Sequence, residues 1–435
     1  MTVGEDAGRE AGRDAGRDAG TSAVERSLAA IAEADATLGA FATVRAAAAR
    51  AEARRIAQAP ASRTSADLPL GGVPVAVKEM LDPAGDHVVV RRLRDAGAVI
   101  VGTTRMPQGC LWGTTDGGGV VTRNPWNRRW TAGGSSGGSG AAVAAGLVRM
   151  AHGTDGLGSV RIPAACCAVV GVKPGHGVIA PVDLGAGDWF GLTEHGALAT
   201  SVEDAALMLS VLAADPSLAR VEEAGGGLRV ACSVTPPVAG VPVATEVVRA
   251  TFAAAAALRA TGARVERDGP RYPLTAGPAV TARWFAAAAD EAAELDDADL
   301  EPRTRRHAEV GRLARRAVRP SQADSWRDQA LQFFSRYDVL VTPVLAAGPL
   351  RAERWSERSW AANVAANVLC TGGFPAAWNL AGFPAVAVPG GVDPRNGLRV
   401  GIQLVGPPGS ESRLLGVAAS FERLRPWPRV APATT

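Results

Sequence analysis

Short apolar runs alternate with helical segments in the first half of the sequence. The apolar runs are Val73–Val77, Ala98–Val101 and Ala168–Val172, and helical patterns cover residues near 87–95 and 201–213. Such runs, separated by amphipathic helices, are typical of strands buried on both sides within an α/β sheet. The pattern therefore predicts a single α/β domain in which helices cover both faces of a large mixed sheet.

The second half of the sequence returns to strands after a long charged stretch. Residues from about 245 to 335 have a mostly helical pattern, which predicts a helical excursion from the sheet. Val339–Val341 then predicts a strand, and Ala385–Val388 and Leu398–Val405 predict a hairpin around an Asn-Gly dipeptide. We therefore expect both halves of the chain to contribute strands to one sheet.

Composition and charge narrow the class of protein. Residues 1–21 are rich in glycine and charge without an apolar stripe, which predicts a disordered tail, and residues 22–435 are predicted to form one domain. The net charge is +3, and no run of basic residues interleaved with aromatic residues suits a nucleic-acid partner. No uninterrupted apolar run reaches the roughly 18 residues that a membrane span needs, so no membrane partner is expected.

The cysteine pattern bears on metals and on the cellular compartment. The five cysteines form no C-x-x-C pair and no cysteine-histidine cluster with zinc spacing, so no metal site is predicted. A sparse, odd cysteine count in a long chain suits a reducing compartment, and the N-terminus lacks the apolar region of a signal peptide. We therefore expect a cytoplasmic protein, with a homodimer left open as its oligomeric state.

Lysine is almost absent from this sequence. Of the 46 Lys and Arg residues, only Lys78 and Lys173 are lysine. An amine can lose its proton and serve as a base, which a guanidinium cannot do. Lys78 follows the apolar run that ends at Val77, and burial disfavours the charged form of an amine. Lys78 is therefore a candidate base, whereas Lys173 is interpreted as structural.

The run Gly133–Gly140 contains only glycine and serine, and several interpretations compete. A flexible linker is disfavoured by the apolar segments that flank the run. A P-loop needs a lysine at its end, and this run has none. A dinucleotide-binding turn or a G-x-S-x-G nucleophile elbow needs a buried strand directly before it, and Asn127-Arg128-Arg129-Trp130 does not have the pattern of one. The remaining interpretation is a site where the backbone approaches a reaction centre closely and serine hydroxyls transfer protons.

A second glycine-bearing turn, Gly153–Pro163, follows a helix of small residues. Backbone N–H groups before Ser159 could converge on one point, and such a nest would bind an oxyanion. Asp155 and Arg161 flank the turn and are expected to pair. These features make Ser159 a candidate nucleophile.

The two turns together resemble the signature of the amidase signature family. That signature runs from a G-G-S-S-G-G block, through a helix of small residues, to a D-x-G-G-S-x-R-x-P block. This chain has Gly133–Gly138 and then Asp155–Pro163, and Ser135 and Ser159 lie 24 residues apart, as in the family. Lys78 matches the family's lysine, and the resemblance covers most of the chain.

The resemblance implies a function and a set of site residues. It implies an amidase that hydrolyses the carboxylic amide C–N bond of a small-molecule substrate, without a metal ion or an organic cofactor. Ser159 would form the acyl-enzyme, Lys78 would be the base, and Ser135, which follows a cis peptide bond in the family, would relay the proton. The implied oxyanion hole consists of backbone N–H groups of Gly156, Leu157, Gly158 and Ser159. The implied supporting residues are Ser136, Thr154, Asp155 and Arg161.

Two other functions remain alternatives at this point. An acyl-transferring or amide-forming biosynthetic enzyme would use the same three residues with an amine as the acceptor. A catalytically impaired scaffold would fit two departures from the family pattern. Leu157 stands where the family usually has a glycine, and the segment Asp82–Asp86 is shorter than usual, which would leave Lys78 less covered.

Overall fold

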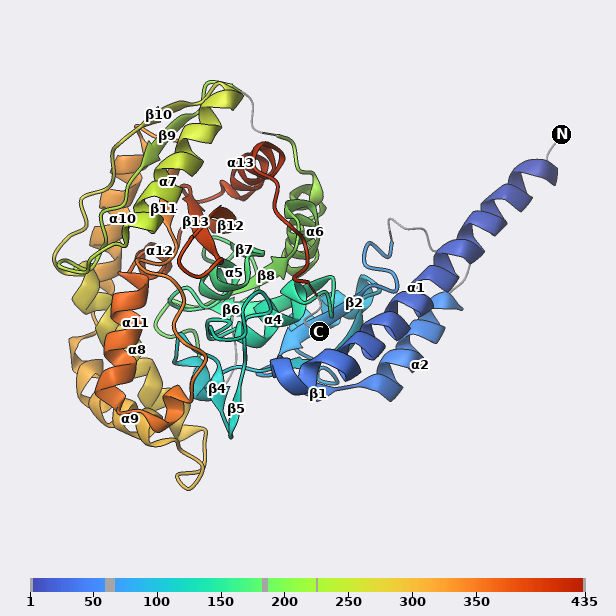
Figure 1. The fold of residues 1–435 in the computed structure, drawn as a ribbon, viewed down its shortest axis with the longest axis horizontal. Helices are drawn as coiled ribbons and strands as arrows, with labels where there is room; N and C mark the ends of the chain where they lie inside the picture. The colour runs from blue at the N-terminus through green and yellow to red at the C-terminus, as the bar shows by residue number, and fades with distance from the viewer. Residues whose placement is uncertain (1–2, 59–66, 182–186, 224–225, 433–435) are drawn as a thin grey trace.

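The computed structural model describes residues 3–58, 67–181, 187–223 and 226–432, with side chains from Gly20 onward. Its centre is one mixed sheet of eleven strands in the order β1-β3-β2-β6-β8-β7-β12-β13-β11-β9-β10 (Figure 1). The strands of this sheet are β1 (Phe41–Val44), β2 (Pro74–Lys78), β3 (Val99–Thr104), β6 (Met150–Asp155), β7 (Val170–Lys173), β8 (Glu194–Ala199), β9 (Arg229–Cys232), β10 (Arg264–Glu266), β11 (Val339–Pro343), β12 (Ala385–Val392) and β13 (Arg399–Val405). The predicted mixed sheet, with strands from both halves of the chain, is confirmed.

Parallel and antiparallel pairs occupy different parts of this sheet. Strand β2 runs parallel to both β3 and β6, and β9 runs parallel to both β10 and β11. The central pairs from β6 to β11 are antiparallel, as is the edge pair of β1 and β3. The predicted hairpin is the antiparallel pair β12 and β13, with Ala385 opposite Val405. Because β2 and β6 are parallel neighbours, the segments that follow their C-terminal ends leave the same edge of the sheet.

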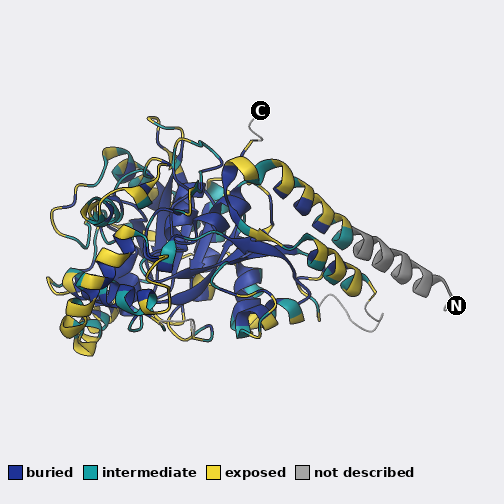
Figure 2. Ribbon diagram, turned by 90° about the horizontal axis from the view of Figure 1, so that it is seen from below, coloured by how far each residue is buried: buried dark blue, intermediate teal, exposed yellow. Residues whose placement is uncertain are grey.

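Helices cover both faces of the sheet, as predicted, and the buried strands lie between them in Figure 2. Successive side chains of a strand point to opposite faces, so Val75 and Val77 of β2 belong to one core and Ala76 to the other. The helices of the first core are α3 (Val88–Asp95), α6 (Val202–Ala213), α7 (Thr245–Ala257) and α13 (Glu411–Leu424). Those of the second core are α1 (Val3–Leu38), α2 (Ala46–Ala57), α4 (Gly137–Ala144) and α5 (Arg161–Cys167).

A third group of helices shares a core with the face of β9, β11, β12 and β13 that is turned away from α7. Its members are α8 (Ala276–Ala293), α9 (Pro302–Ala314), α10 (Pro320–Phe334), α11 (Trp360–Thr371) and α12 (Ala376–Ala381). Helices α8 to α10 fall within the predicted excursion at about 245–335. Helices α8 and α10 share an aromatic core with Trp112, Trp189 and Trp378, and α9 contributes the ring of His307, which packs against Trp112. Helix α7, from the same stretch, packs against β11, β12 and β13 on the opposite face of the sheet.

The N-terminal helix α1 runs from Val3 to Leu38 and crosses the predicted boundary at residue 22. The side chains of residues 1–19 lie outside the described part of the chain, so the disordered tail over residues 1–21 stays a prediction. No helix within the described residues is both long enough and apolar enough to cross a membrane.

Candidate active site

Lys78 ends strand β2, and its side chain is fully buried. The Nζ atom lies 2.7 Å from Ser135 Oγ and 2.9 Å from Thr154 Oγ1, and both of these partners are uncharged hydroxyls. Met80 Sδ in turn accepts a hydrogen bond from Thr154 Oγ1 at 3.3 Å. The expectation that the short segment Asp82–Asp86 leaves Lys78 less covered is wrong, because the Lys78 side chain is fully buried.

Ser135 lies in the glycine-serine loop that leads into helix α4. The Gly134–Ser135 peptide bond is cis, as the resemblance implies. The backbone here passes so close to its neighbours that a Cβ at residue 134 would lie 2.4 Å from the carbonyl oxygen of Trp112. Only glycine fits at that position, and this tight packing excludes the flexible-linker interpretation.

Ser159 lies on the turn between β6 and α5, and the residue is only 8% exposed. Its carbonyl oxygen accepts a hydrogen bond from the Ser136 N–H at 3.1 Å. Ser136 Oγ accepts from the Thr154 N–H and donates to the Thr154 carbonyl oxygen, each at 3.3 Å. These bonds join the two glycine-bearing segments, and Ser135 and Ser159 line one small inner cavity. The structure thus brings together Lys78, Ser135 and Ser159 from three separate segments.

The ion pair of Asp155 and Arg161 lies at the base of the turn that carries Ser159, and both side chains are fully buried. Arg161 Nη2 lies 2.8 Å from Asp155 Oδ1, and Nε lies 2.9 Å from Oδ2. Asp155 also accepts hydrogen bonds from the backbone N–H groups of Gly158 at 2.7 Å and Val160 at 3.2 Å. Burial by itself raises the pKa of Asp155, but the charge and hydrogen bonds of Arg161 outweigh it and hold the pKa below its ordinary value. The carboxylate therefore fixes the backbone on both sides of Ser159.

The backbone N–H groups near Ser159 differ in their availability. The Gly158 N–H is taken by Asp155 Oδ1, so it does not point at a substrate. Within the described part of the chain, the N–H groups of Gly156, Leu157 and Ser159 have no protein acceptor. Gly158 itself has φ +113°, and a Cβ there would lie 2.6 Å from Pro375 Cβ. Gly158 therefore does not fit the oxyanion hole expected from the sequence, and the N–H groups of the other three residues remain the expected donors.

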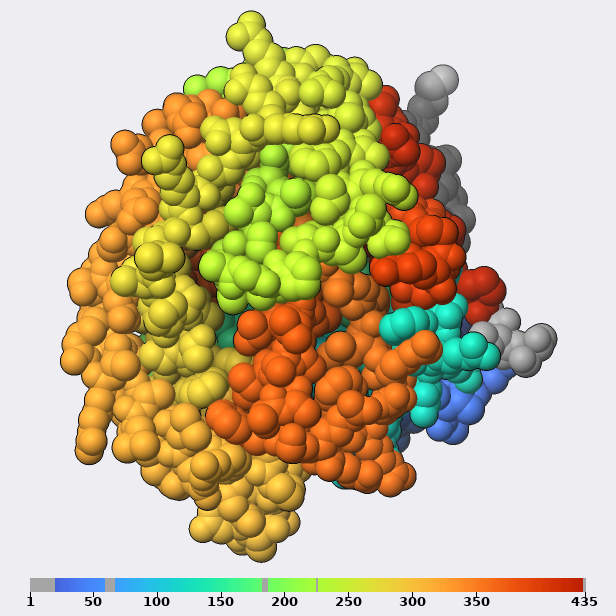
Figure 3. Space-filling model, turned by 60° about the vertical axis from the view of Figure 1, so that its left-hand side comes forward, coloured from blue at the N-terminus to red at the C-terminus, as the bar shows by residue number. Residues whose placement is uncertain are grey.

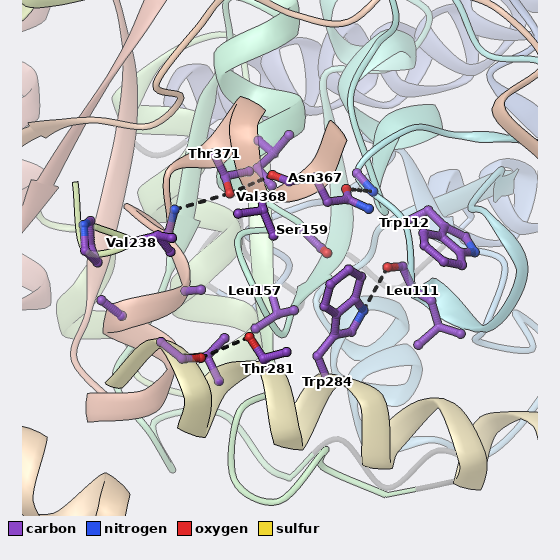
Figure 4. A pocket seen from close by; sticks show the side chains of 18 of the residues that line it. Leu111, Trp112, Leu157, Ser159, Val238, Thr281, Trp284, Asn367, Val368 and Thr371 are labelled. Carbon is purple, nitrogen blue, oxygen red and sulfur yellow. Dashed lines mark hydrogen bonds between the residues drawn. The ribbon is translucent and has the colours of Figure 1, made fainter. Parts of the chain in front are cut away.

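An apolar cavity that opens to solvent leads to Ser159. Its mouth lies where the segment around Val238, helix α8 and helix α11 meet, the yellow-green, yellow and orange surfaces of Figure 3. Figure 4 shows Leu157, Val238, Trp284 and Val368 around the Ser159 hydroxyl. The Leu157 side chain lines this cavity, so the departure from glycine shapes the cavity wall while the residue's N–H stays free.

Several residues that complete the site were not anticipated from the sequence. The Asn379 amide donates to Asp155 Oδ1 at 2.9 Å, and Arg161 donates to Asn379 Oδ1 and to Gln403 Oε1, both at 2.6 Å. Asn379 and Gln403 follow the signature by more than 200 residues, so no local pattern connects them with it. Among the described residues, no group of three or more His, Cys, Asp or Glu side chains is arranged to hold a metal ion.

Buried histidines make the fold sensitive to acid. His195 and His307 are fully buried, and burial lowers the pKa of each to about 3 from the ordinary 6.5. The unfolded chain therefore binds more protons between these two values, so stability falls as the pH drops below 6.5. We expect each histidine to cost about 2 kcal/mol between pH 6.5 and pH 5.

Urea unfolding of the wild type and of His307→Asn at pH 7 and pH 5 measures this effect. The variant should lose less stability between the two pH values than the wild type does. His176 has the opposite effect on the pH dependence of stability, because a hydrogen bond from its ring to Glu194 raises its pKa. An identical pH dependence for the His307 variant and the wild type would contradict the prediction.

The comparisons with known proteins agree with this fold and with an enzyme that acts on amides. The Mycobacterium tuberculosis protein AmiA2, which is named as an amidase, is 37% identical over 447 residues, covering 94% of this chain and 90% of that protein. An acylamidase of Rhodococcus erythropolis is 36% identical, with 84% of each chain covered. The solved structure of a 6-aminohexanoate cyclic dimer hydrolase with its substrate superposes with a TM-score of 0.83 at 28% identity, covering 94% of each chain.

These relatives place the protein among the hydrolases that act on amide C–N bonds. The family model named Amidase matches residues 79–415, which is most of the chain. The chain therefore belongs to the amidase signature family, and it is an amidase.

Proposed function

We infer that this amidase works through an acyl-enzyme on Ser159, with Ser135 as the proton relay and Lys78 as the base. The observation that carries this proposal is the 2.7 Å contact between Lys78 Nζ and Ser135 Oγ, in a cavity that Ser159 also lines. A neutral lysine amine can donate to Thr154 Oγ1 and at the same time accept the Ser135 proton. The amine, the relay hydroxyl and the nucleophile then form one path for a proton.

The reaction begins when the substrate carbonyl carbon is attacked by Ser159 Oγ. The Ser159 proton passes to Ser135 Oγ while the Ser135 proton passes to Lys78 Nζ. The carbonyl oxygen becomes an oxyanion and accepts hydrogen bonds from the free N–H groups of Gly156, Leu157 and Ser159. Collapse of this intermediate breaks the C–N bond, and the proton returns through Ser135 to the leaving amine.

Water completes the cycle along the same path. It attacks the acyl carbon, and its proton moves through Ser135 to Lys78 while the Ser159–carbon bond breaks. Ser159 recovers its proton, and the carboxylic acid leaves. The buried Asp155–Arg161 pair holds the turn during both halves of the reaction, because it fixes the backbone around Ser159 without taking part in proton transfer.

A serine-directed fluorophosphonate tests this assignment. We expect one covalent adduct on Ser159, located by mass mapping of the digested protein. Lys78→Ala and Ser135→Ala should each slow labelling by at least about 100-fold, because both remove a step of proton transfer. An adduct on Ser135 would reverse the two serine roles, and no labelling of the folded wild type would favour the impaired-scaffold alternative. Adding other amines to the amide assay tests the transferase alternative. Hydrolysis releases the original amine and gives the carboxylic acid as the only acyl product, whereas transfer gives a new amide.

A further inference from the structure

Thr193 lies directly before strand β8, beside the turn that carries Ser159. Strands β6 and β8 are antiparallel, and Asp155 at the end of β6 pairs with Glu194 at the start of β8. This register places Thr193 next to Gly156, and a Cβ on Gly156 would lie 3.1 Å from Thr193 Oγ1. The Thr193 hydroxyl therefore faces the backbone of the turn that carries the nucleophile.

Hydrogen bonds fix Thr193 relative to this turn. The Asn379 side-chain amide donates to the Asp155 carbonyl oxygen at 2.7 Å and to the Leu192 carbonyl oxygen at 3.0 Å. The Thr193 N–H donates to the Asp188 carbonyl oxygen at 3.1 Å. One amide group therefore joins the segment of Thr193 to the start of the turn, and the fold sets the position of the Thr193 hydroxyl relative to the reaction centre.

The Thr193 hydroxyl has no partner of its own. Its Oγ1 atom is buried without a hydrogen bond to any described residue, and Thr193 is only 8% exposed. By contrast, the hydroxyls of Ser135 and Thr154, which line the same inner cavity, both bond to Lys78 Nζ. Because a buried hydroxyl without a partner is costly, the Thr193 hydroxyl indicates a ligand in the inner cavity.

The size and the lining of the inner cavity suit a water molecule. The cavity has room for about one water, and Ser135, Ser159 and Thr193 are among its lining residues. A buried water needs at least about two polar partners, which the hydroxyls of Ser135 and Thr193 provide. The acyl chain of a substrate does not fit there, but the apolar cavity that opens to solvent also reaches Ser159 and has room for it.

The second half of the proposed reaction needs a water molecule in this place. After the amine has left, the water oxygen attacks the acyl carbon on Ser159 Oγ while one of its protons passes to Ser135. The other water proton is donated to Thr193 Oγ1, which leaves a lone pair of the water oxygen for the acyl carbon. The new O–C bond forms, the bond from the carbon to Ser159 Oγ breaks, and Ser159 recovers its proton from Lys78 through Ser135.

We propose that the inner cavity is the binding site of the hydrolytic water, and that Thr193 orients this water for attack on the acyl-enzyme. This inference rests on the proposed acyl-enzyme mechanism. Thr193 then acts in deacylation and not in acylation, because no water takes part in the attack of Ser159 on the substrate. Loss of the hydroxyl releases the water from its orientation and leaves the nucleophile, the relay and the base unchanged.

Thr193→Val tests the proposal, since valine keeps the shape of threonine and lacks the hydroxyl. With p-nitrophenyl hexanoate, whose leaving group makes deacylation the slow step, kcat reports deacylation and kcat/KM reports only the steps up to acylation. We expect kcat to fall by at least about tenfold and kcat/KM to stay within about twofold of the wild type. Intact-mass spectrometry should show a larger fraction of hexanoyl-enzyme in the variant. Thr193→Ser, which keeps the hydroxyl, should keep kcat within about threefold.

The matched control is Thr251→Val, which removes the hydroxyl of a buried threonine in helix α7 that donates to the Val247 carbonyl oxygen at 2.8 Å. It should leave kcat and the fraction of hexanoyl-enzyme unchanged. The same result for Thr193→Val would overturn the water site and leave the proposed function intact. Equal losses of kcat and kcat/KM in Thr193→Val would also overturn it, since Thr193 would then support the turn and not the water. No hexanoyl-enzyme in either protein, with no fluorophosphonate adduct on Ser159, would contradict the proposed function and the inference together.

Discussion

Replacing Lys78 with methionine is expected to lower kcat/KM for amide hydrolysis by about 10³-fold. Methionine fills much of the space of the buried lysine stem but cannot accept the proton that Ser135 passes on. Ser159 would then have to attack as a neutral hydroxyl, which is a weak nucleophile. Steady-state kinetics on the wild type and the variant, with any one hydrolysed amide, measures the loss.

Lys173 is the matched control for this experiment. It is the other lysine of the chain and is equally buried, but its Nζ donates to the Pro174 carbonyl oxygen at 2.7 Å, and neither Ser135 nor Ser159 is among its hydrogen-bond partners in the described part of the chain. Lys173→Met should retain activity within about tenfold of the wild type, with any loss explained by reduced stability. Comparable losses of activity in the two folded variants would contradict the proposal that Lys78 acts as the base.

Replacing Arg161 with methionine is expected to destabilise the fold by about 3–5 kcal/mol. The change leaves the Asp155 carboxylate buried without its cation, and the hydrogen bonds of Arg161 to Asn379, Gln403 and the Pro375 carbonyl oxygen are lost with it. Urea unfolding gives the change in the free energy of unfolding. Activity should fall as well, because the turn that carries Ser159 depends on Asp155 for its shape.

A double variant distinguishes the uncompensated charge from a simple loss of packing. Asp155→Asn in the Arg161→Met background removes the buried charge and keeps an acceptor for the Gly158 N–H. The double variant should therefore be more stable than Arg161→Met alone. The exposed pair Arg306–Glu309 is the surface comparison, and Arg306→Met should change stability by no more than about 0.5 kcal/mol. Strictly additive losses in the double variant would contradict the charge argument.

Much of the fold can be predicted from local patterns in the sequence. The apolar run before Lys78 forms β2, and the segments at 385–388 and 398–405 form the hairpin of β12 and β13. These elements are predictable because burial and turn chemistry act on neighbouring residues. The packing of the helical excursion is harder to predict from the sequence pattern. Helix α7 joins the core on one face of the sheet, whereas α8 and α10 share a core with the opposite face of β9, β11, β12 and β13. A helix shows an apolar side in its sequence without showing which surface that side will meet.

The sequence by itself indicated the candidate residues of the centre, because the two serines lie in glycine-bearing motifs 24 residues apart and Lys78 ends an apolar run. Only the tertiary structure decided which distant residues fix the turn that carries Ser159 and which residues line the cavities around it. Asn379 and Gln403 reach Arg161 from the far end of the chain, and Thr193 reaches the inner cavity from the segment before β8. The physical reason is that these contacts depend on how distant elements pack, and packing leaves no periodic or spaced signal at either residue. The position of Leu157 also depends on this packing. Its N–H has no acceptor in the described part of the chain, and its side chain lines the apolar cavity.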